Sequence, residues 1–468
     1  MILDTVQNLL NGLRRSLAQP SRTPRMAVVI GRLLAIAFLL CFGTGIYSHF
    51  LQDPLPWMVF TTRPVFLYQL TQGIHITAGI LCFPLLLAKL YIVFPELFQT
   101  PSVKSFPHLL ERASIALFVA SSIVQIVTGL LNTYQWYALF PFPFRQTHYA
   151  LSFVIVGSLA IHIAVKLDVI AKHWRAPRVE QESRVEPAPR VEPAPRVEPV
   201  ETSPRVEPAP RVEPVETSPP VETALVSTSS TRGSGRINPL TSSPTKNAVD
   251  RVEGVTGRVF AWIDKTPPAE PRTSRRGFLT VVGVASAAVV ALTAGQSFRV
   301  LDGSNIFGPR KQGVGPNALP VNRTAKAAKV GEKATAAGWA LTVSNGATSK
   351  SYSRAELLAM PQFEVELPIA CVEGWSQTAT WKGVRVGDLV DSVGASGGVT
   401  VRATSLEENS SYAVMRMGPE YVRDNLTLVA LELNGEVLDL DHGYPARMIA
   451  PGRPGVLQTK WLSTLEVL

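Results

Sequence analysis

Residues 367–390 read LPIACVEGWSQTATWKGVRVGDLV, and the cysteine in this stretch, Cys371, decides how the C-terminal part of the chain is interpreted. The apolar run at 363–370 predicts a β-strand that leads directly into the cysteine. Gly374, three residues later, permits a close approach of the backbone to a neighbouring group. The other two of the three cysteines lie inside long apolar segments, so a disulfide framework is not expected. Taken alone, Cys371 would be interpreted as an inert buried thiol.

A second stretch, residues 428–467, reads LVALELNGEVLDLDHGYPARMIAPGRPGVLQTKWLSTLEV and contains NG-x-x-L, HG-x-P-x-R, PG and KW in that order. The two stretches together resemble the molybdenum-ligand segment and the second signature of the sulfite oxidase family of molybdopterin enzymes. That family includes bacterial sulfoxide reductases that are exported by the twin-arginine route. The resemblance covers about residues 325–468. It implies a mixed α/β (α+β) molybdopterin-binding oxidoreductase domain there.

The local pattern agrees with a mixed domain. Asn434-Gly435 lies between two apolar runs and predicts a hairpin turn within 426–438. A serine followed by apolar residues at helical spacing predicts a helix at 353–360. The other predicted elements are strands at 339–345, 363–370, 445–451 and 463–468, and a short helix at 386–393.

The resemblance assigns roles to individual residues. Cys371 is implied to be the catalytic molybdenum ligand, in keeping with the preference of soft metal sites for thiolate. The pterin carries a phosphate, which requires fixed cationic donors. By resemblance, His442, Arg447 and Lys460 bind the pterin and its phosphate, and Gly443 lets the backbone approach the cofactor. Substrate-binding arginines outside the two motifs are not defined by the resemblance, and the candidates are Arg402, Arg416 and Arg423.

Residues 273–283 read TSRRGFLTVVG, and Ser274 to Leu279 fit a twin-arginine export signal. A short, weakly apolar segment at 278–295 follows, and it predicts a fifth membrane helix that is not removed. The alternative is an ordinary membrane helix that starts with two arginines. The twin-arginine translocation machinery carries domains that are already folded, usually with a cofactor installed. We therefore expect 273–297 to be an internal signal for the domain at 325–468, with 298–324 as a connecting linker.

Residues 184–220 consist of repeats such as RVEPAP and PVETSPP. Proline every few residues excludes helix and sheet, and little apolar side chain is present to bury. We expect 176–272 to be a disordered, proline-rich cytoplasmic linker. A proline-rich docking site for a partner is the alternative interpretation.

Four long apolar segments at 27–49, 66–94, 113–133 and 148–170 are each long enough to cross a membrane. Lysine and arginine cluster before the first and after the fourth segment, so both ends are predicted to be cytoplasmic. Residues 1–175 are therefore predicted to form an all-α four-helix bundle in the lipid of a bacterial cytoplasmic membrane. The C-terminal domain is expected on the extracytoplasmic side. The net charge is +9, and the basic residues are scattered around the apolar runs. They therefore indicate membrane orientation, and no nucleic acid is expected as a partner.

Four histidines lie in or beside the apolar segments: His49, His75, His148 and His162. Intramembrane histidines are costly and mark functional sites, and b-type haem is held by histidines on facing helices. The pattern is similar to that of di-haem cytochrome b subunits, which implies one or two haem b groups. His148 and His162 are fourteen residues apart, or ~21 Å along a helix. The expected depths of the histidines in the membrane favour pairing His49 with His148 and His75 with His162. The alternative pairs His75 with His148.

The expected function is a membrane-bound molybdopterin oxidoreductase that acts on a small extracytoplasmic substrate and exchanges electrons with the quinone pool through haem b. Oxidation of sulfite and reduction of a sulfoxide or a related S- or N-oxide both fit. Two alternatives stay open. One is an anchored, haem-free molybdoenzyme with a separate electron carrier, and the other is a degenerate, non-catalytic binding module.

Overall fold

The computed structural model describes residues 21–95, 105–137, 142–175, 274–408 and 410–468. The predicted disordered linker at 176–272 lies outside the described residues. Within them, five helices are long and apolar enough to cross a membrane. They are α2 (Pro24–Gln52), α3 (Leu67–Val93), α4 (Phe106–Thr133), α5 (Phe144–Val165) and α8 (Arg275–Thr293). The four predicted segments and the fifth helix are thus confirmed as helices.

Polar side chains cap the starts of three of these helices. Thr23 accepts a hydrogen bond from Met26 N, Ser105 accepts one from His108 N, and Ser274 accepts one from Gly277 N. The fourth helix differs from its prediction. It starts earlier, at Phe144, and breaks at Lys166 before the short helix α6 (Leu167–His173). At this break the ammonium group of Lys166 pairs with Glu111 of α4 at 2.5 Å.

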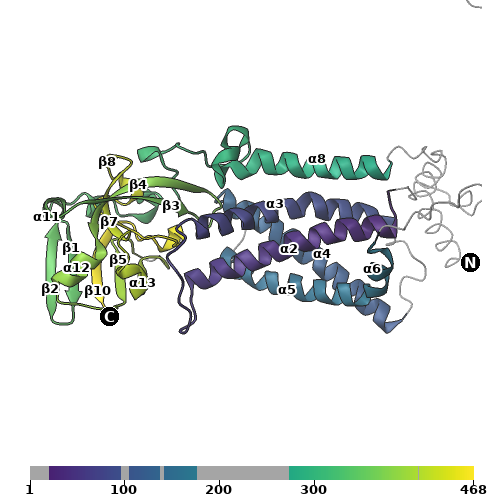
Figure 1. Ribbon diagram of the computed structural model, residues 1–468, viewed down its shortest axis with the longest axis horizontal. Helices are drawn as coiled ribbons and strands as arrows, with labels where there is room; N and C mark the ends of the chain where they lie inside the picture. The colour runs from purple at the N-terminus through teal and green to yellow at the C-terminus, as the bar shows by residue number, and fades with distance from the viewer. Residues whose placement is uncertain (1–20, 96–104, 138–141, 176–273, 409) are drawn as a thin grey trace, which may run out of the picture. The chain divides into compact units, whose positions relative to one another are not determined.

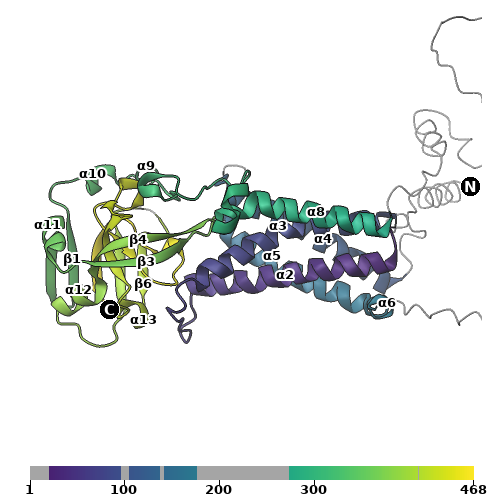
Figure 2. The same ribbon diagram turned by 45° about the horizontal axis from the view of Figure 1, so that its top comes forward.

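Figures 1 and 2 show α2, α3, α4, α5 and α8 side by side. Their inward faces meet in a cluster that includes Phe38, Leu86 and Phe118. Their outward faces carry large apolar side chains, such as Ile36 at 55% and Leu39 at 58% exposure. Apolar surface on this scale is unfavourable in water, and together with the length of the helices it identifies a membrane protein.

The C-terminal domain contains two five-stranded sheets. The first has the order β2-β1-β10-β5-β6, with β1 and β10 parallel and the other neighbours antiparallel. Its strands are β1 (Ala340–Asn345), β2 (Thr348–Ser353), β5 (Val401–Ser405), β6 (Val414–Met417) and β10 (Leu462–Val467). The second has the order β3-β4-β7-β8, with β9 also paired to β7. Its strands are β3 (Phe363–Ala370), β4 (Ser376–Arg385), β7 (Leu428–Leu433), β8 (Glu436–Val437) and β9 (Arg447–Ile449).

Short helices connect these strands: α9 (Ala325–Ala328), α10 (Gly331–Ala334), α11 (Arg354–Ala359), α12 (Val386–Ser392) and α13 (Pro419–Val422). Short 3₁₀ helices lie at η3 (Ala294–Gln296), η4 (Arg299–Ser304), η5 (Pro316–Ala318), η6 (Leu440–His442) and η7 (Gly455–Leu457). Helix α11 starts at the predicted serine, and there Ser353 and Glu356 form a capping box in which each side chain bonds the other's backbone N–H. The mixed α+β architecture is confirmed.

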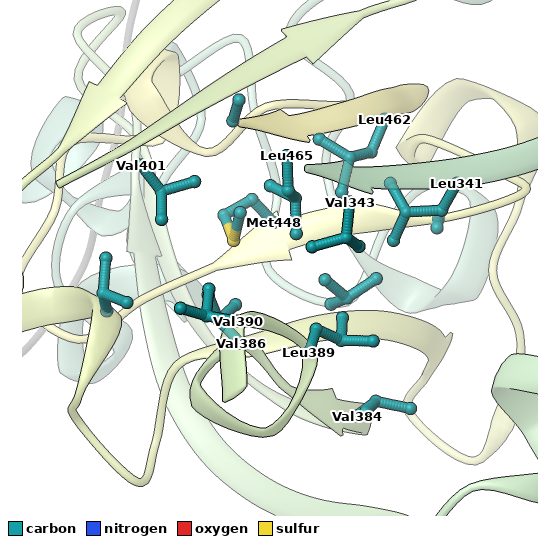
Figure 3. Close-up of a cluster of buried hydrophobic side chains, with 14 of the residues drawn as sticks. Leu341, Val343, Val384, Val386, Leu389, Val390, Val401, Met448, Leu462 and Leu465 are labelled. Atoms are coloured by element: carbon teal, nitrogen blue, oxygen red, sulfur yellow. The ribbon is translucent and has the colours of Figure 1, made fainter. Parts of the chain in front are cut away.

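The core of the domain lies between the two sheets and α12 (Figure 3). Leu341 and Val343 of β1 meet Leu389 of α12 and Met448 of β9, and all four side chains are fully buried. Each such side chain stabilises the fold by roughly 1.5–3 kcal/mol. This core holds β9 in place, and β9 begins with one of the predicted site residues, Arg447.

Candidate molybdenum and haem sites

Cys371 opens a tight loop between β3 and β4. The strands pair up to Ala370 and Ser376, and the loop closes through Cys371 N donating to Trp375 O at 2.8 Å. Gly374 has φ +95°, a conformation that favours glycine. The cysteine side chain is 1% exposed. The loop therefore holds one buried thiol in a defined position.

The surroundings of Cys371 keep its thiol protonated. Burial raises the pKa of Cys371 well above its ordinary value, and nearby Glu373 raises it further. Burial likewise raises the pKa of Glu373, whose carboxylate oxygens accept hydrogen bonds from Gln135 and Trp375. A bound metal cation would replace the proton, since coordinating thiols are deprotonated. The thiol would fit a molybdenum centre on these grounds.

The structure brings together the other predicted pterin contacts. Gly443, with φ +112°, is wedged between Arg447 and Lys460: a Cβ on it would lie 3.1 Å from the Cβ of each. Arg447 is 1% exposed and donates to the carbonyl oxygens of His442 and Gln458. Its Nε is buried and has no hydrogen-bond partner in the described part of the chain. A buried guanidinium with an unused donor fits an anionic group such as a phosphate.

Lys460 completes this cationic cluster. Its Nζ donates to the carbonyl oxygens of Arg323 and Asp441 at 2.8 and 2.7 Å. Burial, followed by the charge of Arg447, lowers the pKa of Lys460 to about 7. Burial also lowers the pKa of Arg447, to about 9. Burial causes both shifts, the charge of Arg447 adds to the shift of Lys460, and an anion would relieve them.

The side chain of His442 makes contacts outside the cluster of Gly443, Arg447 and Lys460. Its Nε2 lies 2.9 Å from Pro316 O and 3.0 Å from Leu319 O, so it ties η6 to the segment around η5. Burial and the charges of Arg447 and Lys460 lower the pKa of His442 to about 4. The neutral ring can donate from Nε2 to these carbonyl groups. Through its backbone carbonyl group, His442 also holds Arg447.

Two of the four predicted haem ligands face each other inside the helical bundle. The rings of His75 on α3 and His148 on α5 have centroids 6.2 Å apart. His75 Nδ1 lies 2.8 Å from Cys41 O, and with Nδ1 as the donor its Nε2 is left as a ligand atom. Gly45 and Gly129 lie beside these rings, where Cβ atoms would come within 3.0 Å of His75 and 3.6 Å of His148. Two opposed imidazoles between small residues fit a haem.

The other two histidines are not paired in this way. His49 stacks on Tyr149 with ring centroids 3.8 Å apart, and His162 stacks on Phe118 at 6.4 Å. His162 Nδ1 is buried without a hydrogen-bond partner among the described residues. The depth argument placed His75 opposite His162, but in the structure His75 lies beside His148. Proximity therefore favours the alternative pairing.

A cavity of about 1130 Å³ extends from the helical bundle to the loop that follows Cys371. Its lining includes His49, His75 and His148 in the helical bundle, and Val372 and Glu373 in the loop of Cys371. Arg323, whose carbonyl oxygen binds Lys460, also lines it. Three of the four haem candidates and the two residues after Cys371 thus border one continuous space, whereas Cys371 itself is not among its lining residues.

Sequence analysis missed several residues around Cys371. Gln135 and Asn132, at the end of α4, donate hydrogen bonds to Glu373 and to Val372 O. About 240 residues separate them from this loop along the chain, so no local pattern in the sequence indicates these contacts. Two of the substrate-arginine candidates are engaged elsewhere, since Arg402 pairs with Glu466 and Arg423 pairs with Asp391.

The fold joins a bundle of apolar helices to an α+β domain that holds a buried thiol. Comparison with known families agrees. Residues 327–468 match the oxidoreductase molybdopterin binding domain, and residues 22–175 match prokaryotic cytochrome b561. The chain therefore joins a sulfite oxidase-like molybdopterin domain to a cytochrome b561 domain.

Curated relatives match the C-terminal part. Sulfite oxidase of Arabidopsis thaliana is 29% identical over 113 residues, which is 20% of this chain and 29% of that protein. Mitochondrial sulfite oxidase of Homo sapiens is 27% identical over 152 residues, 26% of this chain and 27% of that protein. The chain thus spans less than a third of the length of these relatives. The crystal structure of the sulfane dehydrogenase SoxCD from Paracoccus pantotrophus is 21% identical, covering 28% of this chain and 38% of that one, with a TM-score of 0.26.

Proposed function

We propose that the protein is a membrane-bound molybdopterin oxidoreductase that exchanges electrons between a small substrate and the quinone pool through haem b. The observation that carries this proposal is the shared cavity, which borders both the His75–His148 pair and the loop of Cys371. A haem site beside the loop of the candidate molybdenum ligand suits transfer of electrons within one chain.

In this proposal Cys371 is the ligand to molybdenum, which when bound supplies oxygen-atom transfer coupled to a two-electron change. Arg447 and Lys460 bind the phosphate of the pterin, and Gly443 permits its close approach. His442 holds Arg447 through its carbonyl oxygen and ties two loops of the pocket together.

His75 and His148 bind one haem b in this proposal. His49 lines the same cavity, whereas His162 lies beside Phe118, so a second haem would require another partner for His162. Two reactions fit: oxidation of sulfite, and reduction of a sulfoxide or a related S- or N-oxide. The first is the reaction for which the relatives are named.

We also propose the sidedness expected from the sequence. Arg32 near the start of α2 lies over the ring of Trp174 just after α6, at 4.6 Å, so the two cationic ends of the bundle lie together. The positive-inside rule makes that end cytoplasmic. The twin-arginine pair Arg275-Arg276 starts α8, and the translocation machinery would carry the domain at 325–468 across the membrane.

The test is a substrate-dependent change in haem absorbance. Sulfite added to the oxidised, detergent-purified protein should reduce the haem, or a dialkyl sulfoxide added to the reduced protein should reoxidise it. Cys371→Ser should abolish the response while the haem spectrum persists. An equal response in the wild-type protein and in Cys371→Ser would contradict the proposal.

A further inference from the structure

Helix α4 ends in an unusual way. Gln135, two residues after its last helical residue, has φ +57°, a left-handed conformation that glycine adopts without cost. The turn is closed by Gln135 N donating to Asn132 O and Trp136 N donating to Leu131 O. A helix end of this type normally favours glycine, so a side chain at this position has a cost that its contacts must offset.

The side chain of Gln135 uses this conformation to reach the molybdopterin-type domain. Its amide nitrogen donates to Glu373 Oε1 at 2.6 Å and to Asn322 O at 2.7 Å. Glu373 is 8% exposed and lies two residues after Cys371. The amide thus satisfies Oε1 of a buried carboxyl group beside the candidate metal ligand, while Oε2 accepts from Trp375 and pairs with Arg310 at 3.9 Å.

Asn132 makes a second contact to the same loop from the last turn of α4. Its Nδ2 donates to Val372 O at 3.0 Å, and its Oδ1 accepts a hydrogen bond from Tyr137. Val372 directly follows Cys371. Two side chains from one helix end therefore hold the two residues after the cysteine.

A third contact joins the loop to the helix that carries His75. A Cβ on Gly374 would lie 3.0 Å from Ile76 Cδ1, so the loop backbone packs directly on α3. Ile76 is the residue after His75. The loop of Cys371 is thus fixed between α4, through Asn132 and Gln135, and α3, next to a candidate haem ligand.

We propose that Gln135 and Asn132 are positioning residues that hold the loop of Cys371 against the haem-binding helices and thereby set the rate of electron transfer between the two centres. This inference rests on the proposed function for the two metal groups. Each transfer moves one electron, which oxidises one centre and reduces the other, and no bond forms or breaks. Neither residue touches a reacting atom.

The experiment uses the full-length protein in lipid nanodiscs and the variant Gln135→Gly. Glycine suits the left-handed backbone, so the change removes the side chain without adding strain. The matched control is Tyr134→Phe, which removes a hydrogen bond from the neighbouring residue to Phe307 O and leaves the loop untouched. Two quantities are measured: hydrogen exchange of the peptide that covers 371–376, and electron transfer between the centres after flash reduction of the haem.

In Gln135→Gly the amide hydrogens of the loop should exchange roughly tenfold faster, because the hydrogen bond from Gln135 to Glu373 is lost. Electron transfer between the centres should slow by a similar factor. Tyr134→Phe should leave both quantities unchanged. Gln135→Glu keeps the length of the side chain but opposes Glu373, and it should resemble Gln135→Gly.

Equal exchange and equal transfer rates in Gln135→Gly and the wild-type protein would overturn the inference. The inference would also be overturned if Tyr134→Phe changed the exchange of 371–376 and the electron-transfer rate as much as Gln135→Gly does. Failure of the proposed function is recognised separately, because a protein without molybdenum or haem gives no flash signal. Exchange of 371–376 can still be measured in that protein, and unchanged exchange in Gln135→Gly would overturn the positioning role there too.

Discussion

Gly374 lies against Ile76: a Cβ at Gly374 would come within 3.0 Å of the Ile76 side chain. Gly374 is three residues from Cys371, and Ile76 is adjacent to His75. The loop that carries the candidate molybdenum ligand is therefore in van der Waals contact with the helix that carries a candidate haem ligand. Small size at Gly374 makes this approach feasible, in addition to the positive φ that the turn requires.

Substitution of Cys371 should affect the molybdenum centre and leave the haem in place. Cys371→Ser should remove molybdenum-dependent turnover by at least about a hundredfold, since a serine hydroxyl is a poor substitute for a thiolate ligand. The haem spectrum should persist. Cys82→Ser is the matched control, because Cys82 is also buried but packs in the cluster of Phe38 and Phe118. Retained turnover in Cys371→Ser would contradict the assignment of the ligand.

Arg447→Met should have opposite effects on the apoprotein and on cofactor binding. Burial of this guanidinium is costly without an anion, so its removal should leave the free energy of unfolding of the apoprotein unchanged or raise it by about 1 kcal/mol. Binding of the molybdopterin phosphate should weaken at least tenfold, because the fork of donors is lost. Thermal unfolding with and without the cofactor measures both. A large loss of apoprotein stability with unaltered binding would show a purely structural role.

Cofactor binding should weaken as the pH rises through about 7. The pKa of Lys460 in the apoprotein is lowered to about 7, so its ammonium form is present below that pH and is lost above it. A bound phosphate favours the charged form, and binding above pH 7 must therefore take up a proton. Lys460→Gln should flatten the dependence of the cofactor dissociation constant on pH between 6 and 9. An unaltered pH profile in this variant would assign the titration to another group.

The histidine pair can be tested by optical spectra. His75→Leu and His148→Leu should each abolish the haem absorbance that depends on the pair, since both axial ligands are required. His162→Leu is the comparison variant, and it should leave this haem in place because His162 stacks on Phe118. If His162→Leu removed the same haem and His148→Leu did not, the pairing by depth would be the correct one.

The twin-arginine interpretation has its own test. Arg275→Lys together with Arg276→Lys should leave α2 to α5 inserted but retain the C-terminal domain in the cytoplasm. Protease added to spheroplasts should then cut the domain in the wild-type protein and spare it in the double variant. Equal cleavage would refute a signal at this position.

The local sequence predicts much of the C-terminal fold. Strand β3 follows from an apolar run, and helix α11 follows from a serine start with apolar residues at helical spacing, and both signals lie within the segments themselves. The edge strand β2 was missed because TSKSYS is polar, and it is exposed along most of its length. Strand β4 was missed as well, since its apolar residues are interspersed with polar ones and its pairing with β7 is non-local.

The candidate site divides in the same way. Cys371, Arg447 and Lys460 belong to motifs that can be recognised along the chain. The contacts of Gln135 and Asn132 cannot, because they join segments far apart in sequence. The depth argument preferred His75 with His162, whereas α5 begins at Phe144 and the ring of His148 lies 6.2 Å from that of His75. The ligand pairing itself stays a prediction.

The most direct test of the account is the molybdenum and iron content of the full-length protein, purified in detergent from a host that makes the pterin cofactor. We predict one molybdenum per chain together with haem iron, and loss of molybdenum with retention of iron in Cys371→Ser. Iron without molybdenum in the wild-type protein would contradict the account and favour a non-catalytic domain on a cytochrome anchor.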